Sequence, residues 1–254
     1  MRLRIKGRDN VGLVVDKHLV TVDHSVKEHL ITTVNGNPKI STLACGLQVS
    51  SLFTRVKMSG KGRRDRQARL IGDNCPLLYA LKRKDNLVTN VSSVRLLAKS
   101  AYQILDTIVD EMAAELVVCM PSGYSLSRIV GKRCANAFGA CLMTDVFRKT
   151  TKLEAYDMLH RAEQNGDLST SDKRRLDYRL KKSDGFSLKD IPVPDRHYFE
   201  PIRLNPACTG AIRGRVVLVD DLLASGRTLS VATSLIRRMT GVTSISAVCL
   251  FSDV

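Results

Sequence analysis

Hydrophobic residues follow two alternating patterns from about residue 90 to the end of the sequence. Residues 116–120 and 216–219 are wholly apolar, which is typical of strands buried on both faces of a sheet, and a last strand is predicted at residues 244–251. Elsewhere apolar residues recur every three or four positions, which predicts helices at residues 91–112, 127–140, 172–182 and 228–239. Ser92 or Ser93 is available to cap the first helix. Apolar strands that alternate with helices predict an α/β fold, with a mostly parallel twisted sheet flanked by helices.

The first 70 residues have a different pattern, made of short β-branched runs. Runs at residues 3–6, 11–15, 18–22, 31–34 and 40–49 predict short strands, and Asn35-Gly36-Asn37-Pro38 predicts a turn before the last of them. Residues 59–66 are polar, basic and contain glycine, which predicts an exposed loop and a domain boundary near residue 70. We therefore expect a basic β-rich N-terminal region of unassigned role (1–70) and an α/β domain (71–254).

A long polar stretch interrupts the α/β pattern between residues 150 and 205. Only one helix, the one at residues 172–182, is clear within it. A connection of this length is usually functional or mobile, so we expect a hood or lid insertion here.

Composition narrows the class of protein. No apolar run approaches the roughly 20 residues that a membrane helix needs, and the N-terminus lacks the apolar core of a signal peptide, so a cytoplasmic location and no membrane partner are expected. None of the seven cysteines form a Cys-x-x-Cys pair, which argues against a zinc site. The formal net charge is +15, and residues 1–70 hold fourteen Lys/Arg against five Asp/Glu. Such a region attracts polyanions, so it is either a nucleic-acid contact or simply a basic surface, and an enzyme for phosphorylated substrates would also be basic.

One segment, Val216 to Thr228, carries the strongest chemical signal. A buried strand ends at two adjacent acids, Asp220 and Asp221, and a loop of small residues then opens a helix. Ligands of open parallel sheets bind at the carboxyl ends of strands, and the N–H groups at a helix start bind phosphate. Carboxylates accept hydrogen bonds from hydroxyl groups, so phosphate on one side and a diol on the other predict a ribose 5-phosphate site.

This segment also resembles the signature of the type I phosphoribosyltransferases. The resemblance implies that Asp220 and Asp221 contact the ribose hydroxyls and act in catalysis. It also implies that the loop that follows binds the 5-phosphate, through Leu223, Ala224, Ser225, Gly226, Arg227 and Thr228. An ordinary strand-to-helix turn with acids near the helix start is the structural alternative.

The resemblance extends more loosely to residues 116–140. There it implies a pyrophosphate-binding loop, Pro121, Ser122, Gly123 and Tyr124, with Ser125, Arg128, Lys132 and Arg133 as further candidates and Lys82 as another cation. A solvated basic helix face is the alternative for the three cations of the helix. In arrangement the chain is most similar to competence-protein-F-like phosphoribosyltransferases, over roughly residues 75–254, but it lacks the zinc-ribbon cysteines that often precede that domain.

Three functions remain open on this basis. The first is a glycosyltransferase of the phosphoribosyltransferase class, which binds phosphoribosyl pyrophosphate (PRPP) or a nucleoside 5′-phosphate and transfers ribose 5-phosphate to or from a nitrogenous base. The resemblance implies Mg²⁺ as cofactor, held mainly by the ligand. The second is a non-catalytic nucleotide sensor of the same fold. The third is a nucleic-acid-associated component of a competence or defence system. The acceptor base and the oligomeric state are left open.

Overall fold

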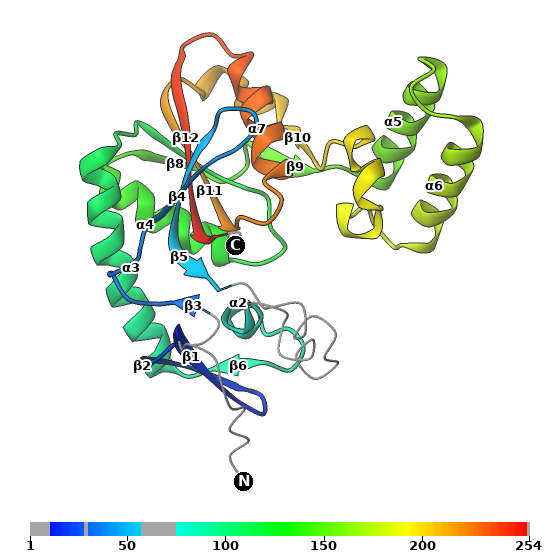
Figure 1. Cartoon of the computed structure of the whole chain (residues 1–254). Helices are drawn as coiled ribbons and strands as arrows, with labels where there is room; N and C mark the ends of the chain where they lie inside the picture. The colour runs from blue at the N-terminus through cyan, green and yellow to red at the C-terminus, as the bar shows by residue number, and fades with distance from the viewer. Residues whose placement is uncertain (1–10, 28–29, 57–74, 253–254) are drawn as a thin grey trace.

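The computed structural model describes residues 11–27, 30–56 and 75–252, and its centre is a seven-stranded sheet (Figure 1). Five parallel strands lie in the order β5-β12-β11-β7-β8, and β3 and β4 pair antiparallel with β5 at one edge. The strands are β3 (Leu30–Ile31), β4 (Lys39–Thr42), β5 (Gln48–Arg55), β7 (Leu116–Cys119), β8 (Cys141–Met143), β11 (Gly214–Leu222) and β12 (Val242–Phe251). This confirms the α/β class with a mostly parallel sheet.

Helices cover both faces of this sheet, and alternate strand residues contact them. On β11, Val217 and Val219 pack in the core that includes α3 (Val91–Glu111) and α4 (Leu126–Phe138). Val216 and Leu218 pack on the opposite face, in the core that includes α7 (Arg227–Arg237). Successive side chains of a strand point to opposite faces, which explains why these buried strands are apolar at every position.

A smaller sheet lies beside α3, at the bottom of Figure 1. It has the order β1-β2-β6 and is formed by β1 (Val11–Asp16), β2 (Leu19–Lys27) and β6 (Val88–Thr89), next to the short helix α2 (Pro76–Leu81). Leu13, Val20 and Leu87 belong to the same buried cluster as α3 and α4. The Ser93 hydroxyl accepts a 2.9 Å hydrogen bond from the backbone N–H of Val22. The small sheet therefore packs onto the main domain.

Residues 150–200 form a helical unit that projects to the side in Figure 1. Two antiparallel strands, β9 (Phe147–Lys149) and β10 (Ile202–Leu204), connect it to the main sheet. The unit contains α5 (Lys152–Gln164), α6 (Thr170–Lys182) and the 3₁₀ helices η2 (Leu188–Asp190) and η3 (Val193–Tyr198); a further 3₁₀ helix, η4 (Pro206–Ala211), follows β10. Buried side chains of α5, α6 and their connections, among them Leu159, Leu176 and Phe199, form a core of its own. We call residues 150–200 the helical insertion.

Every helix and strand predicted after residue 90 is present, with differences at the ends and in the insertion. Asn90, and not Ser92 or Ser93, caps α3, because its side-chain oxygen accepts from the N–H of Ser93. Helix α5 was not predicted, although Thr151 and Glu154 form a capping box at its start. The predicted strand at residues 3–6 and the basic loop at 59–66 lie outside the described residues. Within the described ranges, no helix is long and apolar enough to cross a membrane.

The main sheet extends across the boundary that the sequence predicts near residue 70. Val49, Ser50, Ser51 and Phe53 of β5 pair with β12, close to the end of the chain. Phe53 is fully buried, and its ring centroid lies 6.1 Å from that of Phe251. Residues 30–55 are therefore part of the α/β sheet and not of a separate region. Local pattern does not reveal this, because parallel pairing joins strands that are distant in sequence.

Candidate functional site

Two strand-to-helix loops follow neighbouring strands at the carboxyl edge of the main sheet. Strands β7 and β11 are adjacent and parallel, and each leads through a short loop into a helix, α4 and α7 respectively. In the described structure neither N-cap residue, Ser125 or Gly226, makes a side-chain capping bond, and neither first turn contains an acid. The first N–H groups of a helix have no intrahelical partner and carry partial positive charge. This edge is therefore suited to binding two neighbouring anionic groups.

The acid pair follows the alternation of β11, so the two carboxylates occupy different surroundings. Asp221 continues the series of Val217 and Val219, on the side of α4, and Asp220 continues the series of Val216 and Leu218, on the side of α7. Asp221 is 6% exposed, whereas Asp220 is half-buried. Two adjacent acids in a sequence have the same predicted role, but the strand places these two on opposite faces of the sheet.

Asp221 is paired within the protein. The ammonium of Lys82, which follows α2, lies 2.6 Å from Asp221 Oδ2. The Ser127 hydroxyl of α4 donates to the same oxygen at 3.3 Å. Both partners are largely buried, with side-chain exposures of 15% for Lys82 and 8% for Asp221, so this is an ion pair in a region of low dielectric. Asp221 thus joins α2, α4 and β11 at the sheet edge.

The carboxyl group of Asp220 has a raised pKa. Burial, followed by the charge of Asp221, raises the pKa of Asp220 to about 7, and the hydrogen bond that its Oδ1 accepts from the backbone N–H of Asp221 and the charges of Lys82 and Lys149 act in the opposite direction. Its carboxyl group can therefore change protonation near neutral pH. Perturbed carboxyl groups of this kind concentrate at functional sites.

Lys82 connects the two predicted loops. Besides its contact with Asp221, its ammonium lies 5.4 Å from the centroid of the Tyr124 ring, and Lys84 lies 5.0 Å from the same ring. Tyr124 belongs to the predicted pyrophosphate loop, in which Ser122 and Gly123 are exposed, Pro121 is half-buried and the Ser122 hydroxyl accepts from the N–H of Tyr124. The structure thus brings this loop, Lys82 and the acid pair together, as the sequence analysis expects.

The loop after β11 presents small residues to solvent. Ala224 and Ser225 are exposed, Leu223 is buried and Thr228 is half-buried. Gly226 has φ of +68°, and a Cβ there would lie 2.7 Å from Leu43 Cδ2 in the turn between β4 and β5. Glycine is favoured here by its positive φ, and any Cβ would also have to displace the Leu43 side chain.

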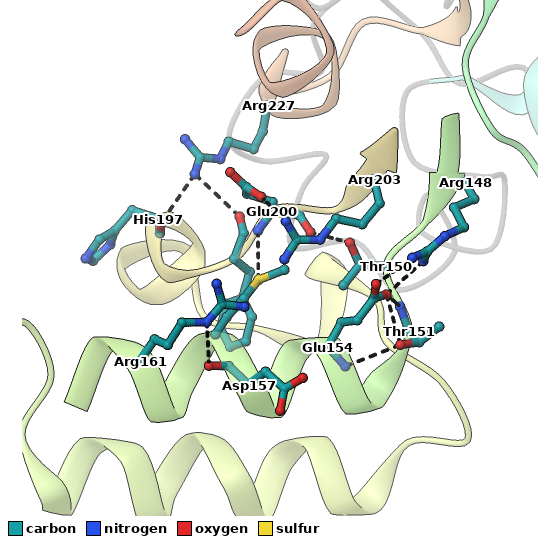
Figure 2. A network of polar contacts seen from close by, with 12 residues as sticks. Arg148, Thr150, Thr151, Glu154, Asp157, Arg161, His197, Glu200, Arg203 and Arg227 are labelled. Carbon is teal, nitrogen blue, oxygen red and sulfur yellow. Dashed lines mark hydrogen bonds and ion pairs between the residues drawn. The ribbon is translucent and has the colours of Figure 1, made fainter. Parts of the chain in front are cut away.

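Arg227 is held by the helical insertion. Its guanidinium donates to the backbone carbonyls of His197 at 3.2 Å and Phe199 at 3.4 Å, at the end of η3 (Figure 2). On the two strands that connect the insertion to the main sheet, Arg148 of β9 pairs with Glu154 at 2.6 Å and Arg203 of β10 pairs with Glu200 at 2.7 Å (Figure 2). Arg227 therefore fastens the insertion to the start of α7, which differs from the direct contact with an anion that the sequence suggests for it.

The three predicted cations of α4 separate into two groups. All three are exposed, and Arg128 lies in the first turn of the helix, close to Tyr124 in the sequence. Arg133 lies over the Tyr102 ring of α3, 5.3 Å from its centroid. Arg128 is therefore a better placed candidate for an anion at the start of α4 than Arg133.

Two residues of the site were missed by the sequence analysis. Ser127 was noted only as the beginning of a helix, and Lys149 lies on β9, in a strand that the pattern did not predict. A three-residue strand has too few positions to show alternation, and a serine near a helix start is expected as a cap. Only the fold reveals that both residues lie near the acid pair.

Neither a group of metal ligands in the described residues nor a match to a known protein identifies the function of this site. No group of three His, Cys, Asp or Glu side chains that could hold a metal ion occurs among the described residues. No protein-family model matches the chain, and no curated protein matches it significantly.

Proposed function

We propose that this protein binds the ribose 5-phosphate group of PRPP or of a nucleoside 5′-phosphate, and transfers it to or from a nitrogenous base. The observation that carries the proposal is Lys82, which contacts Asp221 after β11 and lies over Tyr124 after β7. These contacts support a single site that includes the acid pair and the starts of α4 and α7, at the carboxyl edge of the sheet. The resemblance of residues 216–228 to type I phosphoribosyltransferases supports the same assignment.

The proposed binding mode follows from the chemistry of each loop. The 5-phosphate would lie against the N–H groups at the start of α7 and the hydroxyls of Ser225 and Thr228. Asp220, which has no side-chain ion pair among the described residues, would accept hydrogen bonds from the ribose hydroxyls. The diphosphate would lie at the start of α4, near Tyr124, Lys82 and Arg128.

The chain's residues would assist transfer chiefly by holding and balancing charge. When the bond between ribose C1 and the diphosphate breaks, its electron pair leaves with the diphosphate and positive charge develops on the ribose. Lys82, Arg128 and the α4 N-terminus would stabilise the leaving charge, and ionised Asp220 would favour the cationic ribose. Mg²⁺ held mainly by oxygens of the ligand would neutralise more of the diphosphate charge. This is compatible with a site that offers only two carboxylates, which lie on opposite faces of β11, and no group of three metal-ligating side chains among the described residues.

The helical insertion is proposed to cover the bound ligand. It is anchored by Arg227, beside Gly226, and by β9, whose last residue Lys149 acts electrostatically on Asp220. A cover that excludes water would strengthen every electrostatic contact in the site.

The test is a calorimetric titration of the purified protein with PRPP and Mg²⁺. The Asp220→Asn/Asp221→Asn variant should lose binding. The Asp106→Asn/Asp110→Asn variant, which removes two exposed carboxylates from α3, is the matched control and should bind as the wild type does. Absence of binding by the wild type would refute the proposed site.

The same samples would be assayed for release of pyrophosphate with a panel of nucleobases. Release with one base would identify the transfer reaction. Binding without release from any base would contradict the transferase and favour the nucleotide sensor, with the ribose-phosphate site retained.

A further inference from the structure

The outer face of α6 carries a dense group of cations. Leu176 and Leu180 are buried in the core of the insertion, and Arg174, Tyr178 and Lys182 lie on the opposite side, four residues apart, with Arg179 on the same flank. At a rise of about 1.5 Å per residue, these side chains recur roughly every 6 Å along the helix. All four are exposed. We call Arg174, Arg175, Tyr178, Arg179 and Lys182 the α6 basic face.

Positive charge within the insertion is concentrated on α6, and the rest of the insertion is acidic. Residues 170–182 hold six Lys/Arg against two Asp/Glu, whereas the remainder of residues 150–205 holds five against eight. A segment that needed charge only for solubility would not require this separation of signs. The positive field is therefore concentrated on one helix.

The described carboxylates near α6 pair with Lys173 and Arg175 and not with Arg174, Arg179 or Lys182. Asp172 and Asp195 pair with Arg175 at 3.0 and 2.8 Å, and Glu163 and Asp177 lie 3.2 and 3.7 Å from Lys173. In the part of the chain that the structure describes, no carboxylate pairs with Arg174, Arg179 or Lys182. Their charges are available to an external anion.

An aromatic ring lies within the α6 basic face. Tyr178 is 59% exposed, and the Lys182 ammonium lies 4.5 Å from its ring centroid. The side chains of the α6 basic face line a shallow open groove. The groove itself is lined mainly by the apolar parts of these side chains and by the Tyr178 ring, while the side chains that line it end in cationic groups. An exposed ring beside cations matches the way in which proteins bind single-stranded nucleic acid, with cations along the backbone and bases stacked on aromatic side chains.

We propose that the α6 basic face binds single-stranded nucleic acid, with Arg174, Arg179 and Lys182 contacting phosphates and Tyr178 stacking on a base. The proposal does not depend on the ribose-phosphate site. A membrane surface is disfavoured because an interfacial helix needs apolar side chains beside its cations, and the leucines of α6 are buried in the insertion. The basic face lies on the helix farthest from the main sheet in Figure 1, where an extended polymer has access.

The test is fluorescence anisotropy of a labelled oligothymidylate of about 20 nucleotides, titrated with the full chain over a series of salt concentrations. The Arg174→Glu/Lys182→Glu variant should weaken binding at least tenfold and reduce the salt slope by about 1.4, since each phosphate contact on a single strand contributes roughly 0.7. Tyr178→Ala should weaken binding roughly fivefold or more with little change in salt slope.

Matched variants on α3 make the comparison specific. Arg95→Glu/Lys99→Glu changes the net charge by the same amount on exposed helical positions, and Tyr102→Ala removes a comparable exposed ring that also has a cation over it. Both controls should bind within about twofold of the wild type. Equal losses in test and control variants, unchanged binding in Arg174→Glu/Lys182→Glu, or binding to anionic lipid vesicles but not to the oligonucleotide would overturn the proposal.

Discussion

At the scale of single residues, the acid pair shows how a strand gives two identical side chains different properties. Asp221 points toward Lys82 and Ser127 and is held by both, whereas Asp220 faces the other side and titrates near neutral pH. The sequence indicates that two acids lie at the carboxyl end of a strand. Their different surroundings follow from the alternation of β11 and from Lys82 after α2, which comes from a distant part of the chain.

Replacing Asp220 by Asn should change how stability depends on pH. The carboxyl pKa is about 7 in the folded protein and close to 3.8 when unfolded, so the unfolded chain ionises first and the wild type loses stability as pH rises across this window. Asn keeps the acceptor oxygen but cannot ionise. In urea unfolding, the stability of Asp220→Asn relative to wild type should increase by roughly 1 to 3 kcal/mol from about pH 5 to about pH 8. A constant difference would show that the Asp220 pKa is not raised.

Replacing Lys82 by Met should leave the buried Asp221 carboxylate without its cation. We expect a loss of about 2 to 4 kcal/mol in the free energy of unfolding, because an unpaired buried charge costs more than the pair contributes. Adding Asp221→Asn should recover part of the loss, and Lys84→Met, which removes a cation near Tyr124 without an ion pair to Asp221, should cost much less. Chemical denaturation of the four proteins measures this. Equal losses for Lys82→Met and Lys84→Met would contradict the importance of the pair.

At the scale of elements, the site depends on two loops that each join a parallel strand to a helix. The loop after β11 and the loop after β7 are both readable in the sequence, because a buried apolar run followed by small or turn-forming residues and a helical period is a local pattern. The contact of the loop after β11 with the β4–β5 turn is not local, and Leu43 beside Gly226 is found only in the fold.

Replacing Gly226 by Ala tests this loop. The positive φ costs about 1 to 2 kcal/mol for an L-residue, and the new methyl group must also displace the Leu43 side chain. Gly139→Ala is the control, because Gly139 has φ of +63° at the end of α4 and no atom within 4 Å of an added Cβ. Both variants should lose stability in thermal unfolding, and only Gly226→Ala should weaken PRPP binding. Equal PRPP affinity in the two variants would contradict a role of the loop in binding.

At the scale of the whole molecule, the main sheet joins the beginning and the end of the described chain. Most helices and strands after residue 90 could be predicted, since each is specified by its own periodicity. The place of β5 beside β12 could not, because no local signal records a pairing between strands almost 200 residues apart. Helix α5 is not among the predicted helices, although Ala155, Met158, Leu159 and Ala162 recur at helical spacing and its capping box is visible in the sequence.

A fragment of residues 71–254 should therefore fail to fold alone. It lacks Leu47, Val49, Leu52 and Phe53, all buried in the full chain. At about 1.5 to 3 kcal/mol per buried side chain, their loss is comparable with the total stability of a domain. The fragment should show no cooperative transition by circular dichroism. If the fragment unfolded cooperatively with the same unfolding midpoint as the full chain, residues 71–254 would be an independent domain and the predicted boundary near residue 70 would be correct.

If one ligand spans both loops at the carboxyl edge of the sheet, PRPP with Mg²⁺ should protect both loops from hydrogen exchange. At saturating PRPP we expect slower amide exchange in residues 120–128 and 223–230 together, and no such protection in the Asp220→Asn/Asp221→Asn variant. Saturating PRPP that leaves the exchange of residues 223–230 unchanged would contradict the claim.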